Sequence, residues 1–105
     1  MTRVNIFSCK GKYCGFEISG HSGAGREGND IVCAAISSCA YMVANTVTDV
    51  MGISANARVD DGFMKFEPDI QRMDDYFHLL AGFVLHVTEL EKDYSKNLKV
   101  TFTEV

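Results

Sequence analysis

Residues 20–37 read Gly20-His21-Ser22-Gly23-Ala24-Gly25-Arg26-Glu27-Gly28-Asn29-Asp30-Ile31-Val32-Cys33-Ala34-Ala35-Ile36-Ser37, and this stretch joins an expected strand to an expected helix. Asp30 is a favourable N-cap, because its carboxylate can accept a hydrogen bond from a first-turn amide that has no partner within the helix. Apolar residues then recur at three- and four-residue spacing, which predicts a helix over residues 31–51.

The segments on both sides of this junction alternate as strands do, with a turn at Lys10-Gly11-Lys12 and a hairpin turn at Asp60-Asp61-Gly62. The expected elements are strands over residues 4–9 and 13–19, the helix over 31–51, strands over 54–59 and 63–67, a helix over 69–94 and a strand over 98–102. The order ββαββαβ predicts a two-layer α+β fold, with a five-stranded mixed sheet and two helices on one face.

Size and composition suit a single domain over residues 1–105, because the chain is short and 47% of its residues are hydrophobic. A sheet covered on one face only leaves the other partly bare, which predicts a homodimer. The net charge of -4, with no cluster of Lys and Arg, argues against direct binding to nucleic acid.

The N-terminus enters an alternating pattern directly and lacks the apolar block of a signal peptide. We also expect no apolar run that approaches the roughly 20 residues needed to span a bilayer. These features predict a cytoplasmic protein with reduced thiols and no membrane partner.

Cys33 is the candidate nucleophile, and His21 is the candidate base. With Asp30 as the cap, Cys33 is the third helical residue, where the positive end of the helix dipole favours a thiolate. A histidine on the facing loop could take the thiol proton, as in Cys–His nucleophiles. The amides of residues 32–34 are expected to hold the oxyanion.

Other interpretations of these residues stay open. Cys33 could be a small buried side chain without reactivity. The Asp30 carboxylate would oppose a thiolate unless backbone amides or His21 engage it. Ser37, one turn beyond Cys33 on the same face, either bonds the carbonyl at Cys33 or lines the site.

The glycine-rich segment from Gly20 to Asn29 is a costly connection, because glycine loses the most conformational freedom on ordering. Such a segment suggests close approach to a ligand or a lid that closes over a peptide. Residues 23–28 also match G-x-G-x-x-G. The expected helix begins too late after the third glycine, and the chain is too short for a Rossmann sheet, so dinucleotide binding is not favoured.

A metal site and a cofactor are not expected. A zinc set could be assembled only from Cys9, Cys14, His21 and Cys33, which lack a second closely spaced pair. His78 and His86 are eight residues apart on the second expected helix, too far apart to hold one ion.

The whole chain resembles the bacterial ribosomal-processing cysteine proteases, the Prp family, in length, in element order and in two sequence features. These are the Gly20-His21 pair and the run Asp30-Ile31-Val32-Cys33-Ala34-Ala35-Ile36-Ser37. The resemblance implies that Cys33 is the nucleophile, His21 its base, and an acyl-enzyme the intermediate. It implies a homodimer whose substrate is the N-terminal extension of a large-subunit ribosomal protein, number twenty-seven, cut after a run containing aromatic residues.

The chain departs from the usual family pattern within the loop, at Ser22, Gly25 and Glu27, and these changes leave the Cys–His pair untouched. A rival hypothesis of another class is a non-catalytic ribosome-associated module that uses the same groove to hold a peptide. Selective reaction of Cys33 with a thiol probe at mild pH would separate the two.

Overall fold

The computed structural model describes the backbone of residues 1–20 and 27–105, and the side chains of residues 1–20 and 31–105. Its elements are β1 (Thr2–Cys9), β2 (Lys12–Ser19), α1 (Glu27–Asn45) continued by a π-helical turn (Thr46–Val50), β3 (Ala55–Asp60), β4 (Phe63–Pro68), a 3-10 turn (Ile70–Arg72), α2 (Met73–Asp93) and β5 (Leu98–Glu104). This order confirms the predicted succession of strands and helices.

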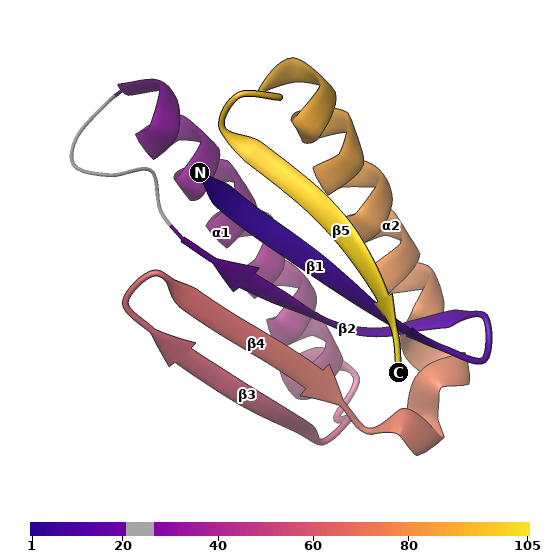
Figure 1. Ribbon diagram of the computed structural model, residues 1–105. Coiled ribbons are helices and arrows are strands. Elements are labelled where there is room, and N and C mark those ends of the chain that lie inside the picture. The colour runs from indigo at the N-terminus through magenta and orange to yellow at the C-terminus, as the bar shows by residue number, and fades with distance from the viewer. Residues whose placement is uncertain (21–26) are drawn as a thin grey trace.

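The five strands form one mixed sheet in the order β3-β4-β2-β1-β5. β1 pairs in parallel with β5, whereas β1–β2, β2–β4 and β3–β4 are antiparallel. Both helices lie on the same side of the sheet (Figure 1). The predicted α+β class, with two helices on one face, is therefore confirmed.

The core lies between the sheet and the helices because alternate strand residues are apolar and face the helices. Val4 and Ile6 of β1 are buried, as are Phe16 of β2 and Phe66 of β4. The ring of Phe16 stacks on that of Phe83 in α2, with centroids 4.4 Å apart. Such burial of aromatic surface fixes α2 against the centre of the sheet.

The uncovered face of the sheet carries many polar side chains, and the cations of Lys65 and Arg58 lie over the rings of Phe7 and Phe63. Ion pairs join Arg58 to Asp60 and Lys65 to Glu67, while the hydroxyls of Thr101 and Thr103 donate to the Asn5 side chain. These side chains remain solvated without a helix to cover them.

The predicted hairpin turn is confirmed between β3 and β4. Asp60 pairs with Phe63 across it, and Gly62 has a φ of 68°. That backbone region costs glycine nothing and most other residues about 1 kcal/mol or more, which is why a glycine there favours a tight turn.

The predicted start of the first helix is wrong. α1 begins at Glu27, so Asp30 lies within its first turn and does not cap it, and part of the expected glycine-rich loop is helical. The earlier start also includes Gly28, a residue type that disfavours helices, which is why the sequence pattern did not predict it. The helix also ends differently, in a π-helical turn over Thr46–Val50.

The second helix starts later than predicted. A 3-10 turn occupies Ile70–Arg72, and its cap is Asp69, whose carboxylate accepts a hydrogen bond from the Gln71 amide at 3.0 Å. Asp69 therefore begins a capped turn, as its residue type favours, and α2 proper begins at Met73.

The expectation that no apolar run approaches the length needed to span a bilayer is wrong for Ile31–Val50. This segment has 20 residues and a mean hydropathy of 1.6, which reach the range of membrane-spanning helices. Length and composition alone are weak evidence, because the core helix of a folded domain passes the same test. Here Val32, Ile36, Ala40 and Val43 are buried in the core. Their spacing is that of an amphipathic helix packed on a sheet.

Candidate active site

Cys33 of α1 contacts the sheet at Thr2, the first residue of β1. Its sulfur lies 3.2 Å from Oγ1 of Thr2, within hydrogen-bond range for a sulfur partner. Thr2 is 2% exposed, and its amide donates to the Asn97 carbonyl just before β5 at 2.9 Å. The half-buried thiol is thus held beside the amino end of β1. That end of β1 lies in front of α1 in the view of Figure 1.

Two details of the sequence interpretation of Cys33 are wrong, because α1 starts at Glu27 and Cys33 is its seventh residue. Seven positions put Cys33 roughly 9 Å along the axis from the first residue, beyond the turn in which the dipole acts strongly. The amides of residues 32–34 donate to carbonyls four residues earlier and so are not available for an oxyanion.

Gly20 anchors the end of β2 beside this site. Its amide donates to the Gly62 carbonyl at 3.0 Å, and its φ is 77°. A Cβ at this position would lie 2.5 Å from the Met1 carbonyl oxygen. The chain therefore needs glycine where it leaves the sheet, directly beside the residue that precedes Thr2.

The remaining predicted site residues are placed only in part. His21 and residues 22–26 of the glycine-rich segment expected to act as a lid lie outside the described residues, so the Cys33–His21 pair and the lid remain predictions. The side chain of Asp30 also lies outside the described part. Ser37 is exposed on α1, one turn beyond Cys33.

Thr2 was missed by the sequence analysis. It shares the inward face of β1 with Val4 and Ile6. A hydroxyl on an otherwise apolar inward face must find a hydrogen-bond partner when buried. That pattern is a signal the sequence contains, although it does not name the partner.

Two other thiols lie in surroundings that suppress reactivity. Burial raises the pKa of Cys39 to about 11, and its thiol donates a hydrogen bond to the Ile36 carbonyl, which a thiolate could not do. Burial also raises the pKa of Cys14, with smaller contributions from Cys9 and Glu67. Since the thiolate is the nucleophile, neither is suited to catalysis near neutral pH.

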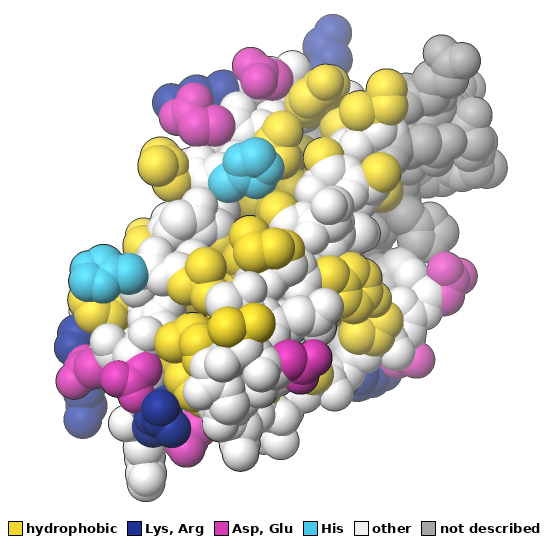
Figure 2. All heavy atoms as spheres, turned by 180° about the vertical axis from the view of Figure 1, so that it is seen from behind, with side chains coloured by type: hydrophobic (Ala, Val, Ile, Leu, Met, Phe, Trp, Pro, Cys, Tyr) yellow, Lys and Arg dark blue, Asp and Glu magenta, His cyan; other side chains and the backbone are white. Residues whose placement is uncertain are grey.

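Among the described side chains, those of residues 1–20 and 31–105, no group of three His, Cys, Asp or Glu could hold a metal ion. The zinc set considered from the sequence includes His21, which is outside these ranges. His78 and His86 instead border an apolar groove of about 350 Å³ between the two helices, with Cys39, Met42 and Phe83. Figure 2 shows apolar side chains gathered beside the two histidines on this face.

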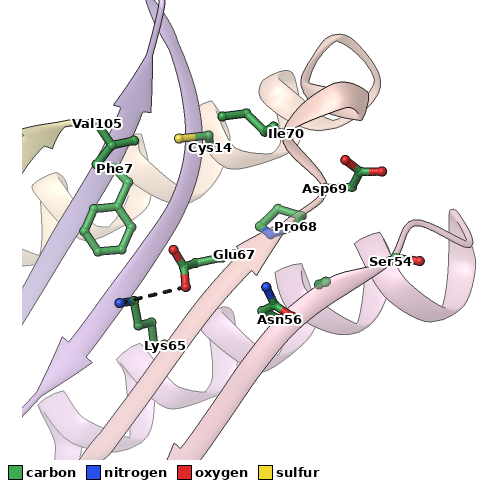
Figure 3. Close-up of a pocket in the computed structure, with 11 residues that line it drawn as sticks. Phe7, Cys14, Ser54, Asn56, Lys65, Glu67, Pro68, Asp69, Ile70 and Val105 are labelled. Carbon is green, nitrogen blue, oxygen red and sulfur yellow. Dashed lines mark ion pairs between the residues drawn. The ribbon is translucent and has the colours of Figure 1, made fainter.

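A second pocket, of about 550 Å³, is lined by neither Cys33 nor Thr2. Figure 3 shows the residues that line it. Its lining includes Phe7 of β1, Cys14 of β2, Asn56 of β3 and the Lys65–Glu67 ion pair of β4. Phe7 is five residues beyond Thr2, roughly 17 Å along the strand, and alternation points it to the opposite face. This pocket is therefore not an extension of the Cys33 site.

A thiol held against the end of a sheet by the helix that follows a glycine-rich connection is an arrangement suited to cysteine-dependent hydrolysis. Comparison with known families agrees with this class. The family model described as cysteine protease Prp matches residues 1–99, and the chain belongs to this family. It is a cysteine protease, as the sequence resemblance implied.

Individual proteins resemble this chain in sequence or in fold. The ribosomal processing cysteine protease Prp of Bacillus subtilis is 28% identical over 94 residues, which cover 82% of each chain. The crystal structure of SMU.848 from Streptococcus mutans has a TM-score of 0.90 at 26% identity, covering 100% of this chain and 96% of its own. The Staphylococcus aureus protease Prp in complex with a substrate peptide has a TM-score of 0.87 at 22% identity, covering 98% of this chain and 100% of its own.

Proposed function

We propose that this cysteine protease removes the N-terminal extension of a large-subunit ribosomal protein, number twenty-seven, and thereby supports ribosome assembly. The observation that carries the proposal is the family match over residues 1–99. The name of the Bacillus subtilis relative, a ribosomal processing protease, supports the substrate class. The placement of the Cys33 sulfur at the sheet supports its role as the reacting group.

The mechanism follows from a Cys–His pair. His21 takes the proton of the Cys33 thiol, and the sulfur attacks the scissile carbonyl to form a tetrahedral intermediate. His21 then gives the proton to the amine as the C–N bond breaks, which leaves a thioester on Cys33. Water hydrolyses the thioester, which releases the acid product and restores the thiol. No metal or cofactor enters these steps, because the sulfur itself supplies the nucleophile.

The test is incubation of the unmodified chain with a peptide that carries the extension and its junction, followed by mass spectrometry of the products. We expect two fragments and a transient thioester on Cys33. The same peptide with its junction residues scrambled is the matched control. An intact junction peptide would overturn the proposed substrate, and the Cys33 variant that tests the chemistry is treated in the Discussion.

We further propose that the chain is a homodimer. The uncovered sheet face that led to this expectation carries many polar side chains, whereas Met42, which lines the apolar groove between the helices, is 57% exposed, and Leu85 of α2 is 65% exposed. Exposed apolar surface of this kind favours association. Sedimentation at micromolar concentrations should give the dimer mass, and a monomer at every concentration would contradict it. Met42→Glu and Thr101→Glu compare the two faces as interfaces.

We also propose a cytoplasmic location. All four cysteines, each among the described residues, are outside any disulfide, which suits a reducing compartment. Fractionation of bacteria that express the chain should place it with the soluble cytoplasmic contents. Recovery in the membrane pellet would instead favour the reading of Ile31–Val50 as a membrane segment.

A further inference from the structure

We propose that Thr2 is a positioning residue for the reacting thiol, and that its hydroxyl donates a hydrogen bond to the Cys33 sulfur that favours the thiolate. The contact is the 3.2 Å separation of Oγ1 and Sγ. This inference rests on the proposed role of Cys33 as nucleophile. It adds to that role a residue from a different part of the chain.

Thr2 is rigidly held, which a positioning residue must be. Its amide donates to the Asn97 carbonyl, and its register places it opposite Leu98 of the parallel strand β5. The next residue, Arg3, pairs with Ser19 of β2 on the other side. A β-branched side chain in such a strand has few χ1 options, so its hydroxyl keeps its direction.

Burial makes the direction of the hydrogen bond matter. At 2% exposure, the Thr2 hydroxyl has little access to water. When Cys33 is a thiolate, its sulfur can only accept, so the hydroxyl donates and the bond is assisted by charge. The thiol proton goes to the base, while the hydroxyl keeps its own. Stabilisation therefore falls on the charged form, which lowers the pH needed to form it.

The contact between Thr2 and Cys33 supplies a stabilisation of the thiolate that the start of the helix does not. Cys33 is seven residues into α1, where the dipole has weakened. A single fixed donor at hydrogen-bond distance acts at any position along a helix. Three charged groups are close in sequence to the residues of this contact, namely the Met1 amino group, Asp30 and Lys99. All three are retained in every variant below. Their charges therefore do not distinguish the variants.

The experiment measures alkylation of Cys33 by iodoacetamide against pH, with each cysteine followed separately by peptide mass mapping. In Thr2→Val, which keeps the shape and removes the hydroxyl, we expect the midpoint to rise by about one pH unit. That shift makes alkylation near neutral pH about ten-fold slower. Thr2→Ser, which restores the hydroxyl, should keep the original profile. Thr101→Val, the same change on the uncovered sheet face, should also leave it unchanged.

Thr2→Ser and Thr2→Ala form a second pair of variants, which differ from each other only in the hydroxyl. If Thr2→Val does not fold, the midpoints of this pair show whether the hydroxyl favours the thiolate. An unchanged midpoint would overturn the proposal. So would a shift to lower pH, which would mean that the hydroxyl accepts from the thiol and stabilises the neutral form. The readout needs no cleavage. If the chain cuts no ribosomal extension, the proposed function fails while this comparison still decides the role of Thr2.

Discussion

Cys33→Ala should abolish cleavage of the ribosomal extension peptide, with a loss of at least about 10⁴-fold in kcat/KM. Without the sulfur no thioester can form, and no other described thiol lies at the start of β1. The fold should survive, because alanine is smaller than cysteine and favours helix. The measurement is turnover of the junction peptide, together with thermal unfolding followed by circular dichroism.

Cys39→Ala is the matched control, because it makes the same change on the same helix, six residues further on. The Cys39 sulfur lies in the groove between the helices, where burial raises its pKa to about 11. We expect cleavage by this variant to be close to that of the unmodified chain. Retained cleavage in a folded Cys33→Ala protein would remove Cys33 from the mechanism, whatever the substrate.

The elements were predictable from the sequence because each is specified locally. Alternation over residues 4–9 gives a strand, and the apolar spacing after Asp30 gives a helix. Gly62 gives the hairpin turn, and its φ of 68° agrees. Boundaries depend on weaker forces. α1 extends back to Glu27 despite Gly28, and α2 begins only at Met73 because the Asp69 cap competes with the apolar pattern.

The order of the strands was not predictable in the same way. β1 and β5 lie at opposite ends of the chain and yet pair in parallel, with Thr2 opposite Leu98. That pairing depends on packing across the whole domain, which no local pattern contains. The same holds for the contact between Thr2 and Cys33, since a β1 side chain reaches an α1 side chain only after the sheet and helix have come together.

The functional residues also divide into those that a local sequence pattern predicts and those that depend on packing between distant parts of the chain. The short run from Asp30 to Ser37 carries the family resemblance, which implies that Cys33 is the nucleophile. The prediction that Cys33 is the third helical residue assumed that Asp30 is the cap. This prediction is wrong, because Cys33 is the seventh residue of α1. Stabilisation of the Cys33 thiolate is therefore not attributed to the helix dipole. In the proposal above it comes from the sheet, through the hydroxyl of Thr2. This change leaves the base as the part of the mechanism that most needs a direct test.

His21→Ala should reduce kcat/KM by about 10²- to 10⁴-fold, the range expected when a general base is removed. Alkylation of Cys33 should also move to higher pH, toward the pKa of about 8.5 of an unassisted thiol, because no imidazole then accepts its proton. In the proposed mechanism, an imidazolium formed by His21 keeps the Cys33 thiolate populated at lower pH. Both effects should appear without loss of thermal stability.

His78→Ala and His86→Ala serve as matched controls for His21→Ala, because both histidines are exposed on α2 beside the helix groove. Neither variant should change cleavage or the alkylation profile of Cys33. The double variant His21→Ala with Thr2→Val then separates two sources of thiolate stabilisation. If the hydroxyl and the imidazole act independently on the sulfur, their shifts in midpoint add. If His21→Ala alone leaves both the cleavage rate and the alkylation midpoint unchanged, His21 is not the base, and the proton acceptor must be sought among other side chains near Cys33.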